Sequence, residues 1–312
     1  MLLGFASSSC SFAALSATRS LYTKGASLTS ALAFMFASTN LAIEVAALAL
    51  IFLGWPYAIA LFVGAPVLVT VMNVLVRITA PARLADDARA HAQEAEAHEM
   101  DPSAGLPSEM RDRLRDRRAW AHVGDAYVAE WRMVWKELLV GFTVAGAIAA
   151  LVPDSFFGII FPRGDGFWVL PLQTVLAPVL AVMTFIGSMG NGPLDAVLAE
   201  HGVVFGALMA FLYADFVVPP ALKINARYYG WRFSGYLAVI FTISAIVAGL
   251  IVHDIFAGLA IIPSGARSVE ELSAFRLDYT LVLNVVALAV AAVLLAIRTR
   301  AKHESAAQRT AT

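Results

Sequence analysis

Residues 187–231 read GSMGNGPLDAVLAEHGVVFGALMAFLYADFVVPPALKINARYYGW, and this stretch decides the fold class. Small and helix-breaking residues stand at its start, an apolar run carrying Asp215 follows, and Pro219–Pro220 with a basic, aromatic turn close it. A carboxylate within so apolar a run needs a partner or a function, because an isolated charge there is costly. An interrupted apolar segment beside a complete one is typical of transporter cores, where broken helices line a cavity.

A second copy of this pattern lies near the start of the chain, where residues 7–48 read SSSCSFAALSATRSLYTKGASLTSALAFMFASTNLAIEVAAL. When Gly25 is aligned with Gly202 no gap is needed, and Ser38 then falls on Asp215. An internal repeat decides the architecture of a whole chain. We therefore predict two repeats, each with a short broken helix. Chance similarity between two membrane segments of biased composition is the alternative.

The composition indicates an integral membrane protein. Hydrophobic residues make up 60% of the chain and charged residues 14%, whereas a soluble domain is roughly half apolar and about a quarter charged. A net charge of −1 without a basic face gives no support to nucleic-acid binding. The single cysteine excludes an intrachain disulfide and a multi-cysteine metal site.

Several apolar runs approach or exceed the length of about 20 residues that crosses the hydrocarbon core. They lie at residues 26–53, 55–76, 134–152, 169–186, 203–218, 233–252 and 279–297. Two short segments precede Gly25 and Gly202. Together these runs predict an all-α protein, a polytopic bundle of transmembrane helices.

The same runs divide the chain into four parts. These are a first transmembrane repeat (1–77), a cytoplasmic polar connection (78–133), a second transmembrane repeat (134–297) and a cytoplasmic tail (298–312). A long apolar run precedes the motif in the second repeat and almost nothing precedes it in the first, so we expect that a leading helix is missing at the N-terminus. The connection, the turn at 223–232 and the tail are rich in Lys and Arg, which favours the cytoplasmic side. If the spans cross the membrane in turn between these assigned sides, the second repeat has the opposite orientation to the first.

Glu44 and Asp215 are the acids of the spans that follow the two motifs, and Asn40 lies four residues before Glu44 on the same predicted helix face. A charge at the centre of a membrane helix costs about 2.5–3.5 kcal/mol on insertion scales, so each acid must be paired, protonated or hydrated. One hypothesis is a proton relay or a cation-binding pair, because burial favours the protonated carboxyl. The other is structural, with Asp215 paired to Lys223 or Arg227.

The short broken segments carry further candidates. Cys10, the single thiol, could be a soft ligand for a thiophilic solute or a small buried hydrophobe. Asp195 and His201 are expected to play a structural role at the ends of the second segment. Four polar residues that could bind solute or satisfy freed backbone groups stand where the helices are expected to break: Ser9, Ser11, Ser188 and Asn191.

The sequence carries no support for an enzyme. It has no Gly-rich phosphate loop, no HExxH and no GxSxG. The run that contains His91, Glu94, Glu96 and His98 could bind a metal, but it is more typical of a solvated helix face. We therefore predict neither a metal nor a cofactor.

The two motif blocks resemble the predicted permeases related to bacterial organoarsenical efflux permeases. The resemblance rests on SSSCSFAA, KGA and AFMFASTNLAIE in the first half and on GSMGNGPLDAVL and AFLYADFVVPPALKINARYYGWR in the second. It covers nearly the whole chain and implies a permease of the bacterial inner membrane with about eight membrane segments. Gly187 and Asp195 stand where this family usually has a cysteine and an alanine, which weakens the case for arsenic binding by paired thiols. The signature residues that match are Cys10, Ser11, Asn40, Glu44, Ser188, Asn191, Pro193 and Asp215.

These observations predict a multi-pass membrane permease with a cytoplasmic C-terminus. We expect secondary efflux of a small solute, driven by protons or by the membrane potential, and the resemblance points to an organoarsenical or another metalloid compound. The expected partners are the lipid bilayer, the solute and protons; nucleic acid is not among them, and homo-oligomerisation stays open. The alternative is a membrane protein without transport activity, either a receptor or assembly partner or an inactive fragment.

Overall fold

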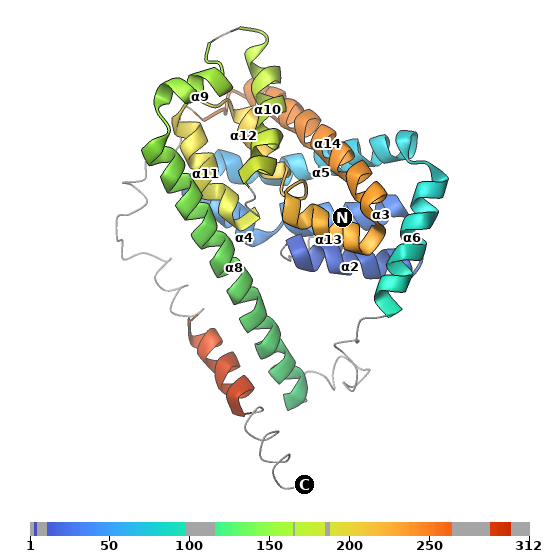
Figure 1. Cartoon of the computed structure of the whole chain (residues 1–312). Coiled ribbons are helices and arrows are strands. Elements are labelled where there is room, and N and C mark those ends of the chain that lie inside the picture. Colours follow the sequence, from blue (N-terminus) through green and yellow to red (C-terminus); the bar gives the residue numbers. More distant parts are fainter. Residues whose placement is uncertain are drawn as a thin grey trace, which may run out of the picture. The chain divides into compact units, whose positions relative to one another are not determined.

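The computed structural model of the chain describes residues 3–4, 11–97, 116–164, 166–184, 188–263 and 288–300 (Figure 1). All regular secondary structure in these ranges is helical, as the sequence predicts. The chain forms two compact units, each described by itself. The first comprises 1–99 and 137–272, and the second comprises 100–136 and 273–312.

The first unit contains the two motif blocks. The helices that lie wholly or partly in it are α2 (Ser11–Thr23), α3 (Leu28–Asn40), α4 (Ile43–Phe52), α5 (Trp55–Thr79), α6 (Ala82–Ala97), α8 (Arg117–Leu151), α9 (Asp154–Ile160), α10 (Val169–Thr184), α11 (Ser188–Glu200), α12 (Phe205–Tyr213), α13 (Pro219–Tyr229) and α14 (Trp231–Gly258).

Two helices in the described residues, α5 and α14, are long and apolar enough to cross a membrane by themselves. Both begin after a glycine with positive φ, Gly54 at 106° and Gly230 at 85°, which is a conformation that disfavours side chains with a Cβ. Pro56 in the first turn and Arg77 in the last turn suit the two ends of α5. These helices coincide with the apolar runs predicted at residues 55–76 and 233–252.

The predicted span at 26–53 is a bent pair, since α3 and α4 meet at a break with an angle of 42° between them. Side chains at the end of α3 bond back to its own carbonyl groups: Thr39 Oγ1 donates to Met35 O at 3.1 Å and Asn40 Nδ2 donates to Phe36 O at 3.3 Å. Such bonds compete with the regular helix ladder and favour its ending there. If the pair is counted as one segment, three segments of the described residues are long and apolar enough to cross a membrane.

The helices of the two motif blocks begin at equivalent positions. The alignment that places Gly25 on Gly202 also places Ser11, the first residue of α2, on Ser188, the first residue of α11, and both helices have 13 residues. Both glycines have positive φ, at 101° and 81°. The second span breaks as well, because α12 ends at Tyr213 rather than continuing through the predicted run at 203–218. A turn at 214–217 separates it from α13.

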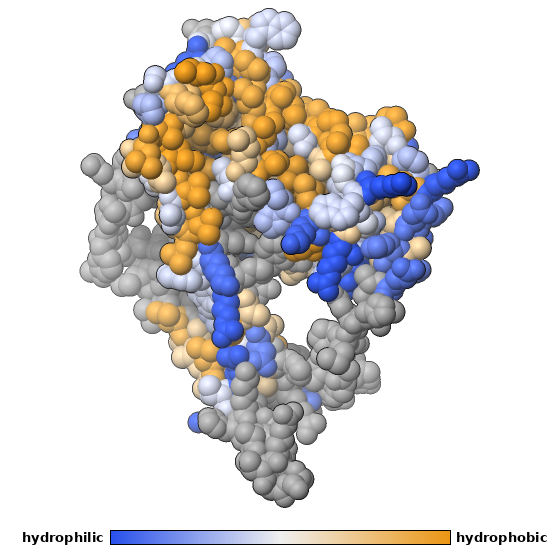
Figure 2. All heavy atoms as spheres, in the orientation of Figure 1, coloured by the Kyte–Doolittle hydropathy of each residue, from blue (hydrophilic) through white to orange (hydrophobic). Residues whose placement is uncertain are grey.

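The core of the first unit forms where the two motif blocks pack on each other. Helix α5 packs along α14, α2 packs on α13, and α11 packs on α4. Helix α3 of the first block also packs on α5, and α12 of the second block packs on α14. Apolar side chains also cover the outside of α10 and α14, where Val179, Met183 and Val239 are exposed, and Figure 2 shows this apolar surface in orange. Exposed apolar helix faces of this kind are expected against lipid.

The second unit contains the first turns of α8 and the helix at 288–300. Arg298 Nε donates to Asp125 Oδ1 at 2.6 Å, which ties the two segments together. Helix α8 is continuous from Arg117, so the boundary predicted between residues 133 and 134 lies inside a helix.

Candidate functional site

The two helix breaks bring buried polar side chains into the apolar core. Ser38, Thr39 and Asn40 close α3 and are buried. Asp215 stands in the turn after α12 and is also buried. Asp215 therefore lies in non-helical backbone rather than on a helix face. The turn therefore holds both a carboxylate and backbone groups that are free of helical hydrogen bonds, a combination that also occurs in the broken helices of transporters.

Aromatic packing holds the two breaks near each other. Phe36 lies two residues before Ser38, and Phe216 follows Asp215 directly. Their rings meet edge to face with centroids 5.3 Å apart, and Phe36 also packs on Phe241 of α14 at 4.7 Å. The structure thus brings the last turn of α3 close to the turn that follows α12, although the two segments are far apart in sequence.

Glu44 takes a different position from the one that the spacing predicts. A residue four positions after Asn40 shares its face only on an uninterrupted helix. Asn40 ends α3 and Glu44 lies in the first turn of α4, beyond the bend. Its half-buried carboxylate is near the positive end of the α4 dipole, which stabilises a negative charge.

Helix α11 carries the remaining described candidates. Asn191 and Pro193 are buried in its first half, and Pro193 stands inside the helix. Asp195, one turn after Asn191, is fully buried too. The sequence predicts a structural role for Asp195, but neither of its carboxylate oxygens has a hydrogen-bond partner among the described residues. Its spacing of four from Asn191 was the available signal for a polar pair on one helix face.

The other candidates lie at the first residues of described helices or outside the described residues. Ser9 and Cys10 fall outside the described residues. Ser11 and Ser188 are the first residues of α2 and α11, at positions equivalent in the two motif blocks. The described residues contain no group of three or more His, Cys, Asp or Glu side chains that could hold a metal ion.

A cluster of cationic and aromatic side chains joins α2, α6 and α13, and no pattern in the sequence points to it. The guanidinium of Arg19 lies over the Tyr228 ring at 4.2 Å, and that of Arg89 lies over the Tyr22 ring at 4.5 Å. Stacking of this kind stabilises a charge that is partly removed from water. Arg19 is buried, so this cluster places a positive charge inside the first unit.

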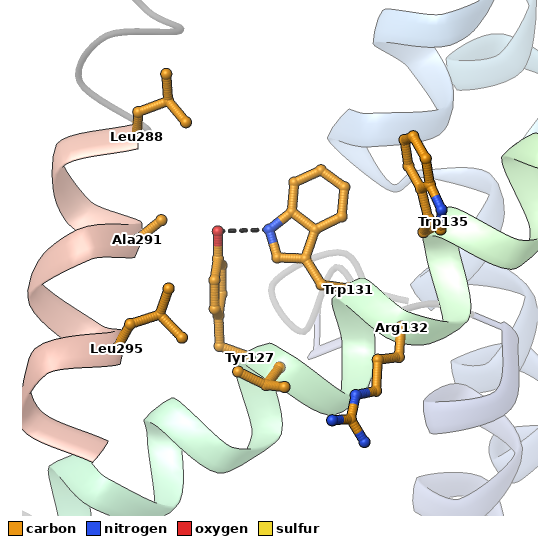
Figure 3. Close-up of a pocket in the computed structure, with 8 residues that line it drawn as sticks. Tyr127, Trp131, Arg132, Trp135, Leu288, Ala291 and Leu295 are labelled. Carbon is orange, nitrogen blue, oxygen red and sulfur yellow. Dashed lines mark hydrogen bonds between the residues drawn. The ribbon is translucent and has the colours of Figure 1, made fainter. Parts of the chain in front are cut away.

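The second unit has an apolar groove of about 860 Å³ between α8 and the helix at 288–300 (Figure 3). Trp131 Nε1 donates to the Tyr127 hydroxyl at 2.6 Å along its wall. Trp, Tyr and Arg side chains on one apolar surface are typical of a membrane interface. Of the predicted site residues that the structure describes, none lines this groove.

Comparison with known proteins identifies the family. A family model described as a predicted permease matches residues 1–254. The chain is 36% identical over 298 residues to a protein of Mycobacterium tuberculosis named "Putative permease Rv2963", and the match covers 94% of this chain and 73% of that protein. No solved structure matches the chain.

Proposed function

The chain belongs to the predicted permease family, and from that premise we propose that it is a secondary permease of the bacterial inner membrane that exports a small solute. Protons or the membrane potential drive the export. The solute pathway runs between the two helix breaks, past Asn40 and Asp215. Organoarsenicals or other metalloid compounds are the first solute class to test, because both motif blocks resemble efflux permeases of that class.

The two motif blocks contact each other twice, through equivalent pairs of helices, and this observation carries the proposal. Helix α2 of the first block packs on α13 of the second, and α11 of the second packs on α4 of the first. The alignment makes α2 equivalent to α11 and α4 equivalent to α13, so the two contacts are one contact seen twice. A two-fold relation requires this exchange. It supports a pair of structural repeats with α5 and α14 packed at their interface.

The distribution of Lys and Arg supports an inverted relation between these repeats. In transporters built from inverted repeats, broken helices from the two copies meet near the bilayer midplane and form the solute site. The contact between Phe36 and Phe216 beside the two breaks agrees with such a site. Rocking of one repeat against the other would then open the pathway to each side in turn.

The proposal is tested by growth of an efflux-deficient bacterial host that expresses the chain under challenge with trivalent inorganic or methylated arsenicals. We expect protection with the natural sequence and loss of protection with Asp215→Asn. Asp254→Asn is the matched control, because it makes the same change at an exposed acid of α14. Cys10→Ser tests whether the single thiol takes part.

Membrane expression of every variant is measured in parallel. Protection that survives Asp215→Asn would contradict the role of this acid. Absence of protection by the natural sequence, with expression in the membrane verified, would contradict the arsenical solute class. Equal loss of protection with Asp254→Asn would show that the effect is not specific to the helix break.

A further inference from the structure

Helix α11 buries two polar side chains that find no hydrogen-bond partner in the described part of the chain. Asn191 and Asp195 are each 0% exposed. The amide nitrogen and oxygen of Asn191 and both carboxylate oxygens of Asp195 are without a partner there. Burial of a carboxylate without compensation is costly. A proton or a bound cation would offset this cost.

The two side chains are placed to act as a pair. They are four residues apart on one helix, so they lie on the same face one turn from each other. Pro193 stands between them and has no N–H, which removes a helical hydrogen bond to the carbonyl group of residue 189. An asparagine amide can both donate and accept. Asn191 can therefore bond to Asp195 whether the carboxyl group is ionised or protonated.

Helices α4 and α12, which pack on α11, carry no Lys or Arg side chain. From α5, Tyr57 is the group that interacts electrostatically with Asp195. On α12 the ionisable side chain is Tyr213, whose hydroxyl donates to Ala60 O at 2.9 Å. On α4 the ionisable side chain is Glu44, which lies in the first turn.

The packing around the pair is close and apolar. A Cβ added at Gly192 would lie 3.7 Å from Leu48 and 3.3 Å from Phe52, both of α4. Gly190 fits against Gly141 of α8, where a Cβ would lie 2.6 Å from the Gly190 Cα. The charge that balances Asp195 must therefore come from outside the side chains described here.

We propose that Asp195 and Asn191 form a binding site for a small monovalent cation, either a proton or an alkali ion. A proton would bond to one carboxylate oxygen, and the new O–H would donate to the Asn191 amide oxygen. An alkali ion would take the two carboxylate oxygens and that amide oxygen as ligands. If the proposed export function holds, this site couples cation movement to solute movement, but cation binding itself does not depend on the solute.

The test uses dicyclohexylcarbodiimide, a membrane-permeant reagent that modifies protonated carboxyl groups in apolar surroundings, on the purified full chain in liposomes. Peptide mass mapping measures modification of Asp195. In one arm the pH is varied in choline chloride at constant ionic strength; in the other, NaCl, KCl or LiCl replaces choline chloride at fixed pH. For proton binding, the ratio of protonated to ionised carboxyl rises about tenfold per pH unit of acidification. For an alkali ion, its salt lowers the modification several-fold.

Three variants keep the test specific, and thermal unfolding of each checks that it folds. Asp195→Asn should abolish the modification of the peptide that contains residue 195, which verifies that Asp195 is the modified residue. Asn191→Leu, which is similar in volume, is expected to shift the pH dependence or abolish protection by salt. Asp254→Asn is expected to leave both unchanged. Asp195 that stays unmodified at every pH, or is modified independently of both pH and salt, would overturn the proposal. Neither result would bear on solute export, which the growth test measures separately.

Discussion

The rings of Phe36 and Phe216 meet edge to face, with centroids 5.3 Å apart and planes at 79°. One ring precedes the break after α3 and the other follows the end of α12. Both side chains are fully buried. This pair therefore connects the two places where the apolar spans lose helical structure, and it does so between residues far apart in the chain.

Removal of one ring of this pair should loosen the junction. We expect Phe216→Ala to lower stability by about 3–5 kcal/mol, because it deletes a buried ring and leaves a cavity. The midpoint of thermal unfolding of the purified protein measures the loss. Phe62→Ala is the control, since Phe62 of α5 is 39% exposed and its removal opens no cavity. A similar loss in both variants would contradict a special role of the junction.

The contact of α5 with α12 depends on the absence of a side chain at Gly64. A Cβ at this position would collide with the hydroxyl group of Tyr213, which now donates to Ala60 O at 2.9 Å. We expect Gly64→Ala to destabilise by about 1–3 kcal/mol, as overpacking of a filled core does. Gly235→Ala on α14 has open space around it, so it should be neutral or slightly stabilising.

A double-mutant cycle separates the clash from other effects of Gly64→Ala. Tyr213→Phe removes the hydroxyl oxygen, so Gly64→Ala should cost less in that background than in the natural sequence. Thermal unfolding of the four proteins gives the interaction energy. An interaction energy near zero would show that the two residues do not constrain each other.

Gln173 of α10 joins two other segments through one buried side chain. Its Nε2 donates to Pro162 O at 2.9 Å, and its Oε1 accepts from Val204 N at 2.7 Å, just before α12. Gln173→Leu leaves both backbone groups unpaired, and each should cost about 1–3 kcal/mol. Gln173→Glu keeps the acceptor for Val204 but loses the donor, so its cost should differ from that of Leu. Identical melting points for natural protein and Gln173→Leu would contradict this role.

Tyr22 contributes to the link between α2 and α6 in two separable ways. Its hydroxyl donates to Ala85 O at 2.7 Å, and its ring lies under the guanidinium of Arg89. Tyr22→Phe removes only the hydrogen bond and should cost about 1 kcal/mol. Tyr22→Leu also removes the stacking, worth about 0.5–2 kcal/mol more. The ranking by thermal unfolding is the check, and equal values for Phe and Leu would exclude a stabilising contact with Arg89.

Much of the fold could be predicted because helix signals are local. Gly54 and Pro56 indicate where α5 begins. The apolar runs predicted at 55–76 and 233–252 each lie within a single long helix. The break after Asn40 was not predicted, because the run at 26–53 is apolar enough to read as one span. The bend arises from side-chain bonds to the helix backbone, which composition does not reveal.

The candidate site was predicted only in part, for a similar reason. Asn40, Asn191 and Asp215 are buried polar residues, as expected for a site within apolar spans. The spacing predicts Glu44 on the same helix face as Asn40, but the bend between α3 and α4 separates them. The sequence predicts a structural role for Asp195, and its lack of partners among the described residues becomes visible only once α4 and α12 pack on α11.

Composition and spacing along the chain suffice to identify an apolar helical protein with two similar motif blocks. Hydropathy, glycine and proline act on neighbouring residues, so their effects can be read along the chain. Which buried polar groups find partners among the described residues depends on how the helices pack in three dimensions. A hydrogen bond or a ring contact forms across space, as between Phe36 and Phe216, and no local pattern specifies the residue on the other side.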